Sequence, residues 1–473
     1  MAAVAWLLDC EPRSVQLEAL RRSHLHGPAR GYCYFMQMRL GKTNVALNEY
    51  LLLKRDHGVT KLLVLAPFSY KGAWASEART FGLDEEVHVF ESAKRTLAQA
   101  FVNAGGRVLV LHYESLISEE TRKLLAGFVD EHTLFVADES VRIKNRNSQF
   151  FKHALDLAKD AGYTRCLTGK PVVQGPQDLW SQLRFARQLD GVNFFHFRNK
   201  YCLMGGFKGK QIVGVKNEVE LDAVLQKCAF VAKRRDWGTN FDSDYVLREV
   251  GPMLPAQKKA YDEMEEDFIT WLEDDTEISA DQAITKYQKL QQIASGFVID
   301  AERQPHTLVA TEKLPKFRDM YETLVEQVEG KAIVVVFYKH SILTLTDLLR
   351  EFQPAVIFGS PTMKLLGRSV EEEKERFTID PKCRILIGQI QAIKYGHNLM
   401  GSLDDPCLTT FYYENTYSLD DRAQSEERNQ GEGQQAAITI IDYHCCDAEL
   451  RIVKALQKKE SLSEAILKPY LKE

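Results

Sequence analysis

The feature that most constrains the fold is the alternation of short apolar runs with helix-forming stretches along the 473-residue chain. Runs that are apolar throughout, rather than at every second position, are typical of strands buried on both faces of a parallel sheet. In the first half, such runs cover residues 31–37, 61–67, 86–90, 107–113, 132–139 and 164–169. In the second half, they cover residues 331–338, 355–360, 383–389, 407–414 and 437–444. Two such series predict an α/β protein with two lobes, each built on a parallel sheet.

A polar, helical stretch separates the two series. Residues 255–295 have the apolar spacing of helices rather than of strands. We therefore expect a first lobe at 1–247, a helical linking segment at 248–310 and a second lobe at 311–473. The glycine-rich stretch Gly205–Lys216 predicts a small hairpin within the first lobe, and we interpret its lysines as ordinary surface residues.

Composition excludes several classes of protein. No apolar run reaches the roughly 18 residues of a membrane span, and the N-terminus lacks the basic flank of a signal peptide. The nine cysteines form no CxxC pair and the twelve histidines show no ligand spacing. We therefore expect reduced thiols, no transition-metal site and a cytoplasmic protein. The net charge of −5 means that nucleic-acid binding would need a locally basic surface.

Some conspicuous residues have a structural interpretation. Trp74, Trp180 and the Phe194–Phe197 cluster are interpreted as core packing rather than as platforms for stacked bases. The acidic run at 371–374 is interpreted as a solvated helix face.

A Gly-Lys-Thr sequence follows the first apolar run and opens a helical stretch. In such an arrangement, backbone N–H groups at the helix start hold phosphates, Lys42 reaches the β and γ oxygens, and the Thr43 hydroxyl binds Mg²⁺. The full phosphate-loop pattern is broken, because Met36 stands at its first position. A Gly-Lys-Thr sequence alone is therefore weak evidence of a nucleotide site.

The apolar run at 132–139 ends in two carboxylates, Asp138 and Glu139. A carboxylate at a strand end can hold Mg²⁺, and a second can orient an attacking water. An isolated Asp-Glu pair is commonly a solvated strand end, but this one follows Lys42 by about a hundred residues, which favours an NTPase. We predict ATP and Mg²⁺ as the ligands of this site.

The motifs together resemble those of the Swi/Snf branch of the superfamily-two helicase-like ATPases, in its compact phage or bacterial form. They are, in chain order, Pro12–Gln16, Ala66–Ser69 with Trp74, His112–Leu116, Asp138–Asn145, Leu167–Pro171 with Asp178–Trp180, Arg234–Arg235, Gly388–Leu399 and Gln424–Gln434. Each string is weak alone, but their order and spacing cover nearly the whole chain. The resemblance implies two RecA-like parallel-sheet lobes joined by a helical segment, with ATP bound between them. It also implies that the protein acts in the cytoplasm of a bacterium or of a phage-infected host.

The resemblance also implies roles for individual residues. The ATP-binding residues would be Arg13, Gln16, Arg39, Leu40, Gly41, Lys42, Thr43, Asn44 and Gln424, with Gln16 reading the adenine. Thr43 and Asp138 would hold Mg²⁺. The catalytic residues would be Lys42, Asp138, Glu139 and Arg428, the last reaching the γ-phosphate from the second lobe. Ser69, Lys144, Asn145 and Thr168 would contact DNA.

Three positions depart from the family's pattern. Arg39 replaces a glycine of the phosphate loop, Lys170 replaces a threonine, and Gly431 replaces the arginine that normally neutralises the γ-phosphate. Such an arginine is typically worth about 10³–10⁵ in rate, so Gly431 puts the rate of hydrolysis in doubt. We expect Arg428, helped by Lys394 or Arg39, to supply the missing charge.

The function that the resemblance implies is ATP-dependent translocation along double-stranded DNA in replication, repair or recombination. Contacts with the DNA backbone carry no sequence information, so binding would be nonspecific. A strand-separating helicase is one alternative. Another is a DNA-binding scaffold that binds ATP but hydrolyses it poorly; Gly431 favours this alternative, and the intact Lys42, Asp138 and Glu139 oppose it. The pathway and any protein partner stay open, and no membrane partner is expected.

Overall fold

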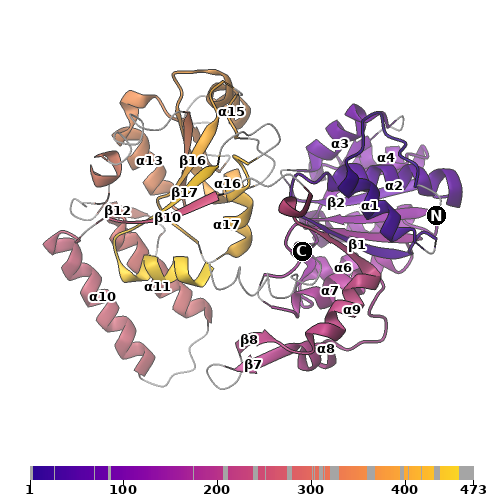
Figure 1. Cartoon of the computed structure of the whole chain (residues 1–473), viewed down its shortest axis with the longest axis horizontal. Helices are drawn as coiled ribbons and strands as arrows, with labels where there is room; N and C mark the ends of the chain where they lie inside the picture. The colour runs from indigo at the N-terminus through magenta and orange to yellow at the C-terminus, as the bar shows by residue number, and fades with distance from the viewer. Residues whose placement is uncertain are drawn as a thin grey trace. The chain divides into compact units, whose positions relative to one another are not determined.

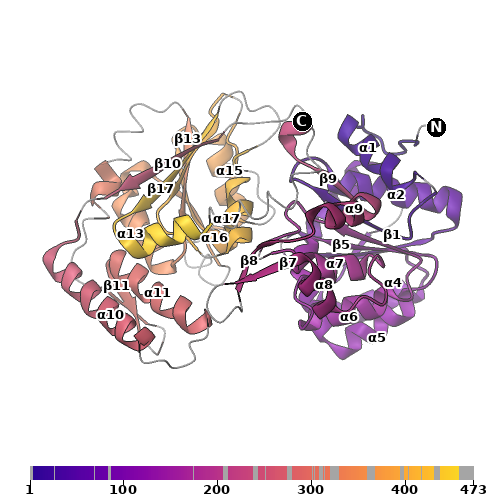
Figure 2. The ribbon, with the colours of Figure 1, turned by 60° about the horizontal axis from the view of Figure 1, so that its bottom comes forward.

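The chain forms two compact units, which are Met1–Asn240 with Lys459–Glu473, and Phe241–Lys458. This computed structural model describes residues 4–456 except positions 26, 69, 84–86, 174, 206–210, 238–242, 251, 274–279, 301, 303, 308–312, 314, 320–329, 360–367, 395–398, 403, 417 and 431–436. Figures 1 and 2 show a sheet flanked by helices in each unit.

The first unit is built on a seven-stranded sheet in the order β3-β4-β2-β5-β6-β1-β9. Each neighbouring pair of these strands is parallel. The strands are β1 (Gly31–Met36), β2 (Lys61–Ala66), β3 (Val87–Val89), β4 (Val108–His112), β5 (Thr133–Asp138), β6 (Tyr163–Leu167) and β9 (Ala229–Ala232). Parallel strands need crossover connections, and here most of these connections contain a helix.

The helices of this unit are α1 (Ser14–Ser23), α2 (Lys42–His57), α3 (Lys71–Thr80), α4 (Arg95–Asn103), α5 (Glu119–Phe128), α6 (Gln149–Ala158), α7 (Asp178–Phe185), α8 (Phe194–Tyr201) and α9 (Glu218–Cys228). Short 3-10 turns are η1 (Ser92–Lys94), η2 (Tyr113–Ile117), η3 (Ser140–Ile143) and η5 (Arg234–Trp237). An antiparallel hairpin pairs β7 (Cys202–Gly205) with β8 (Gln211–Val215).

Two apolar cores lie on opposite faces of the seven-stranded sheet, because side chains alternate along a strand. On β1, Cys33 and Phe35 belong to one core, whereas Tyr34 and Met36 belong to the other. Side chains of α5, α6, α7 and α9 join the first core, and those of α1, α2 and α3 join the second. Burial on both faces explains why these strands are apolar throughout.

The second unit is built on a six-stranded sheet in the order β10-β17-β16-β13-β15-β14, again with parallel pairs. Its strands are β10 (Ser243–Glu249), β13 (Lys331–Val336), β14 (Ala355–Ile357), β15 (Ile385–Gln389), β16 (Cys407–Tyr412) and β17 (Ile438–His444). The central strands contribute alternate side chains to two cores, one on each face.

The helices of the second unit are α10 (Pro255–Glu273), α11 (Ala280–Ala294), α13 (Lys339–Leu348), α15 (Val370–Ile379), α16 (Ile390–Ile393) and α17 (Leu419–Glu426), and residues 447–456 are also helical. A 3-10 turn, η6 (Arg350–Phe352), precedes β14, and a small antiparallel pair joins β11 (Phe297–Ile299) to β12 (Pro305–Thr307). Among the described residues, no helix is long and apolar enough to cross a membrane.

The prediction of two parallel-sheet lobes is confirmed, and each apolar run in the sequence contains a strand of one of the two sheets. The hairpin is also confirmed, although it begins at Cys202 and its tip, with the two lysines, lies outside the described residues. The division between the units falls near residue 240, and residues 243–249 form β10 of the second sheet. Helices α10 and α11 belong to the second unit. The three-part division with boundaries at 247 and 310 stays a prediction.

Candidate active site

The loops that carry the predicted motifs of the first unit lie at one edge of its sheet. Because the strands are parallel, the segments that follow β1, β2, β4, β5 and β6 all leave from their carboxyl ends. That edge is where open α/β sheets bind ligands. The fold therefore brings the Gly-Lys-Thr loop and the Asp-Glu pair to the same edge, although about a hundred residues separate them.

The phosphate loop joins β1 to α2. Gly41 precedes α2 with a φ of +76°, a left-handed conformation that glycine adopts without strain. A Cβ atom at Gly41 would lie 2.1 Å from Nε2 of Gln16, so a side chain here would displace the Gln16 amide. Lys42 begins the helix, and its ammonium donates a hydrogen bond to Met36 O at 3.0 Å. The helix start and a largely buried Thr43 provide the groups that phosphates and Mg²⁺ need.

Arg13, just before α1, and Gln16, in the first turn of α1, form hydrogen bonds with this loop. The Arg13 guanidinium donates to Arg39 O at 2.7 Å, and Gln16 Nε2 donates to Gly41 O at 3.3 Å. Gln16 Oε1 accepts from Arg13 N–H at 2.8 Å, which fixes the orientation of the side-chain amide. Arg13 and Gln16, two of the predicted ATP-binding residues, are therefore adjacent to the phosphate loop.

The other predicted ATP-binding residues of the loop differ in their surroundings. Leu40 is fully buried, and Asn44 Nδ2 lies 3.9 Å from Cys10 Sγ. Arg39 has a φ of +66°, the left-handed conformation in which glycine is favoured. This backbone geometry explains why a glycine would fit at position 39 and why an arginine there carries strain.

Asp138 ends β5 and is buried beside Lys42. Its Oδ2 accepts a hydrogen bond from Trp74 Nε1 at 2.8 Å, and its Oδ1 accepts from Glu139 N–H at 3.0 Å. Burial raises the pKa of Asp138, while the bond from Trp74 and the charge of Lys42 act in the opposite direction. Tyr113 Oη also donates to Asp138 O at 2.7 Å, so both the side chain and the backbone are fixed.

Glu139 has a left-handed backbone with a φ of +47°, and its carboxylate accepts a hydrogen bond from the Thr168 hydroxyl at 3.0 Å. Thr168 was expected to contact DNA, but it is only 1% exposed and its hydroxyl is engaged by Glu139. The structure thus places Thr168 beside the predicted catalytic carboxylate, and its contact with DNA stays a prediction. Its backbone neighbour Lys170 donates its N–H to Thr168 Oγ1 at 3.3 Å.

Helix α3 supplies site residues that the sequence analysis did not identify. Trp74 is buried as expected for a core residue, but it is also the donor to Asp138. Tyr70 donates to Glu77 Oε1 at 2.9 Å. Burial raises the pKa of Glu77, with hydrogen bonds from Tyr70 and Thr43 acting the other way. The spacing of Tyr70, Trp74 and Glu77 over two helical turns is the signal that could have revealed them.

The predicted DNA-contact loops of the first unit are connected by polar contacts. Glu114 accepts a hydrogen bond from His112 at 3.1 Å and pairs with Arg142 from the turn after β5. The hydrogen bond from His112 is the main cause that lowers the pKa of Glu114 to about 2. Asn145 is exposed and Lys144 is half-buried, whereas Ser69 lies outside the described residues.

The predicted ATP-binding residue Gln424 lies in the last turn of α17, and the predicted catalytic residue Arg428 lies just after that helix. Arg428 Nε donates to Gln424 O at 2.6 Å, and both side chains are buried. Among the described residues, Gln424 Oε1 has no hydrogen-bond partner although it is buried. Lys394, a candidate to replace the missing arginine, pairs with Asp421 at 2.6 Å, and Gly431 lies outside the described residues.

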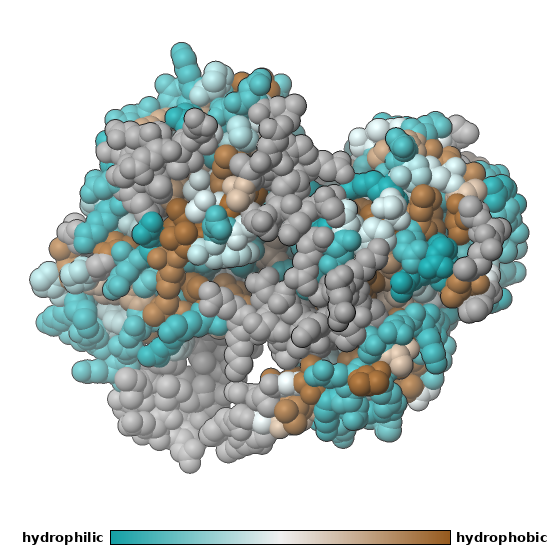
Figure 3. Space-filling model, in the orientation of Figure 1, coloured by the Kyte–Doolittle hydropathy of each residue, from teal (hydrophilic) through white to brown (hydrophobic). Residues whose placement is uncertain are grey.

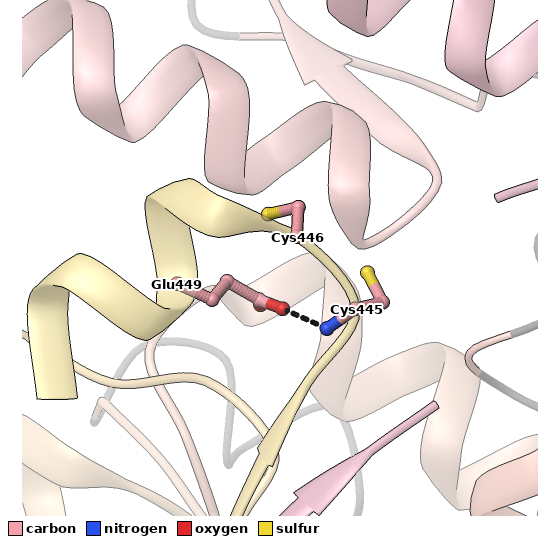
Figure 4. Close-up of side chains that lie close together, drawn as sticks. All are labelled: Cys445, Cys446 and Glu449. Carbon is pink, nitrogen blue, oxygen red and sulfur yellow. Dashed lines mark hydrogen bonds between the residues drawn. The ribbon is translucent and has the colours of Figure 1, made fainter. Parts of the chain in front are cut away.

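A cluster of metal-ligand types occurs elsewhere in the second unit. Figure 4 shows Cys445, Cys446 and Glu449, whose ligand atoms lie within 4.8 Å of one another. The Glu449 carboxylate accepts from Cys445 N–H at 2.9 Å and pairs with the buried Lys313. Lys313 therefore already neutralises the one carboxylate of the group. All nine cysteines are free, as expected, and the absence of a transition-metal site stays a prediction.

The sequence model of the SNF2-related domain matches residues 1–297, which is more than half of the chain. The chain belongs to the SNF2-related family. The match begins before the Gln16 segment and runs past the Thr168 loop, so the carboxyl edge of the first sheet lies entirely within it.

Several proteins are similar to this chain in sequence. "Putative protein p41" of Acyrthosiphon pisum secondary endosymbiont phage 1 is 27% identical over 67% of this chain and 69% of its own length. A Xenopus laevis SWI/SNF-related matrix-associated actin-dependent regulator of chromatin subfamily A-like protein 1 is 21% identical over 85% of this chain. The match to it spans 38% of the frog protein, and the match to a Caenorhabditis elegans homolog spans 27% of that protein.

Among solved structures, the Sulfolobus solfataricus SWI2/SNF2 ATPase core in complex with dsDNA is similar to this chain. It is 18% identical, with a TM-score of 0.45, and covers 99% of this chain and 96% of the archaeal chain.

Proposed function

We propose that this SNF2-related protein hydrolyses ATP and uses the energy to move along double-stranded DNA. The observation that carries the proposal is the cluster of Lys42, Asp138 and Glu139 at the carboxyl edge of one parallel sheet. Lys42 contacts the phosphates, and Thr43 with Asp138 would hold Mg²⁺, since hydroxyl and carboxylate oxygens are ligands that this ion prefers. Bound Mg²⁺ would supply charge neutralisation at the phosphates.

The remaining residues of the cluster orient these groups. Trp74 holds the Asp138 carboxylate by its hydrogen bond of 2.8 Å. Thr168 holds Glu139 by its bond of 3.0 Å, which positions this carboxylate to orient the attacking water. Gln16 recognises the adenine, and its contact with Gly41 links the base to the phosphate loop.

Arg428 would supply positive charge to the γ-phosphate in place of the arginine that is missing at position 431. Its burial and its contact with Gln424 O favour a fixed orientation. Lys394 is a weaker candidate, because it would have to leave its ion pair with Asp421. We expect hydrolysis that is slower than in a motor with both arginines, but real.

Duplex DNA is the proposed substrate along which the protein moves. Similar proteins include a Yarrowia lipolytica DNA repair protein RAD5 and an Arabidopsis thaliana probable ATP-dependent DNA helicase, which are 28% and 32% identical over about a third of this chain. Lys144 and Asn145 lie on the turn that follows the Asp-Glu pair, so DNA contacts there would be sensitive to the state of the nucleotide site. Replication, repair or recombination would be the setting.

The test is phosphate release from ATP with no DNA, with blunt duplexes of unrelated sequence and with single strands. We expect every duplex to stimulate hydrolysis, and we expect the stimulation to fall as salt rises, because phosphate contacts release counterions. Lys42→Ala should remove the activity and serves as the control for contaminating ATPases. Stimulation by single strands alone would favour a strand-separating helicase, and no response to any nucleic acid would exclude DNA as the partner.

A further inference from the structure

A basic surface with an exposed phenylalanine ring lies on the first unit, beside the predicted DNA-contact residues Lys144 and Asn145. It consists of residues 142–148, which include the turn before α6, and helix α8. The guanidinium carbon of Arg146 lies 4.6 Å from the centre of the Phe194 ring and 4.9 Å from that of Phe195. That of Arg198 lies 5.3 Å from the centre of Phe195. We call Arg146, Phe195 and Arg198 the arginine–phenylalanine surface.

The two arginines differ from the other cations of these segments. Arg142 and Lys200 are each paired with a glutamate. Within the described part of the chain, Arg146 and Arg198 have no hydrogen-bond or ion-pair partner, and Nε of Arg198 is buried without one. Neither segment contains an acidic residue, although the whole chain has a net charge of −5. The surface is therefore locally positive on an acidic protein.

The aromatic ring at the centre of this surface is exposed. Phe195 has 49% of its surface accessible, whereas its neighbour Phe197 is buried in the core. The expectation that the whole Phe194–Phe197 cluster is core packing is therefore wrong for Phe195. Figure 3 shows hydrophobic residues beside hydrophilic ones where α8 and β7 reach the surface. Phe195 serves as a support on which the two guanidinium groups rest.

A guanidinium that rests on a ring keeps the N–H donors of its edge available. Arginine stacks on aromatic faces and binds phosphate through parallel N–H donors, so one group can do both. Holding the side chain in place also lowers the entropy that a phosphate contact would cost. The exposed Asn145 and Asn147 on the same turn add amide donors beside the two charges.

We infer that the arginine–phenylalanine surface binds two phosphates of the DNA backbone. This inference rests on the proposed function, and it adds a contact area that the motifs shared with the family do not include. Its position next to Lys144 and Asn145 makes it an extension of that contact along the duplex. Because it contacts only phosphates, it would increase affinity for every DNA sequence equally.

The test is the salt dependence of duplex binding, measured by fluorescence anisotropy with a labelled blunt duplex and the full chain. In the double variant Arg146→Gln with Arg198→Gln, we expect the negative slope of log K against log salt to become shallower by about 1.8, or about 0.9 for each lost phosphate contact. Affinity near 0.1 M salt should fall by roughly tenfold per contact. The melting temperature of the variant checks that it is folded.

Two further variants make the test specific. Arg146→Lys with Arg198→Lys keeps both charges and should retain most of the slope. Arg55→Gln with Arg350→Gln removes the same charge at exposed residues paired with Asp56 and Asp347, and should leave the slope unchanged. If the wild-type chain binds duplex DNA but the first variant keeps its affinity and slope, the inference is wrong while the proposed function stands. If the wild-type chain binds no duplex DNA, both are wrong.

Discussion

At the scale of single residues, Asp138 combines two opposing requirements. In the proposed site it must be ionised to hold Mg²⁺, yet burial raises its pKa. The Trp74 indole N–H and the Lys42 ammonium act against this effect. A hydrogen bond to a charged group is worth about 1.5–3 kcal/mol, so the indole is an important contributor to the ionised state.

The first prediction follows from that hydrogen bond. Trp74→Phe keeps an aromatic ring but removes the donor, so the pKa of Asp138 should rise further. A higher pKa means that the carboxylate is protonated at a higher pH, so activity should be lost earlier as pH falls. ATP turnover measured against pH and Mg²⁺ should show this loss and a higher Mg²⁺ requirement.

Trp180→Phe, which removes a hydrogen bond to Val192 O, is the matched control and should change neither the pH profile nor the Mg²⁺ profile. An unchanged pH profile for Trp74→Phe would contradict this role.

The second prediction separates the two carboxylates. Glu139→Gln should still bind ATP with Mg²⁺ but lose hydrolysis by about 10²-fold or more, because only the orientation of the water is affected. Asp138→Asn should weaken Mg²⁺-dependent ATP binding itself. Equilibrium binding of a fluorescent ATP analogue, measured beside phosphate release, distinguishes these effects. Wild-type turnover in Glu139→Gln would show that its role is assigned wrongly.

At the scale of the elements, the apolar runs predicted all but one strand of each sheet, because a strand buried on both faces has few polar positions. The two edge strands β9 and β10 were missed, since β9 has only four residues and β10 is largely exposed. The phosphate loop and the Asp-Glu pair could be predicted because their residue types and local order define them. The role of Trp74 could not, because its bond to Asp138 joins residues 64 positions apart.

A buried ion pair is another feature that could not be predicted from the sequence. Arg165 of β6 and Glu49 of α2 are both fully buried and form two hydrogen bonds, at 2.8 and 2.7 Å. Tyr34 of β1 donates to the same carboxylate at 2.9 Å. These contacts join two strands and a helix, but they link residues 116 positions apart, so no local pattern reveals them.

The third prediction concerns the stability that this pair provides. Glu49→Gln leaves the buried charge of Arg165 without its partner and should destabilise the first unit by about 3–5 kcal/mol. Burial tends to raise the pKa of Glu49, but Arg165 outweighs it, and the net pKa lies below the ordinary value of 4.5. The contribution is therefore present above pH 4.5 and is lost as pH falls through the lowered pKa. Urea unfolding near neutral pH and in acid checks both points. Asp156→Asn, at the exposed helix pair with Lys159, is the control and should have little effect.

At the scale of the whole molecule, the open question is how ATP is hydrolysed with Gly431 at the position where the resemblance leads us to expect an arginine. The fourth prediction is that Arg428→Ala abolishes ATP turnover, while Gly431→Arg changes it only modestly. The physical reason is that Arg428 supplies the charge that the γ-phosphate requires. Phosphate release with saturating duplex DNA is the measurement. If the native chain is inert and Gly431→Arg raises turnover by about 10³-fold or more, compensation by Arg428 is wrong and the chain is a dormant ATPase.

The central claim is that hydrolysis moves this protein along duplex DNA, and displacement of a third strand from a triplex tests it most directly. A motor that follows the duplex should release the third strand when ATP is present, without separating the two strands beneath it. We expect release by the wild-type chain with ATP, and none with a nonhydrolysable analogue or with Glu139→Gln. Hydrolysis stimulated by duplex DNA without release of the third strand, or separation of the duplex itself, would contradict translocation.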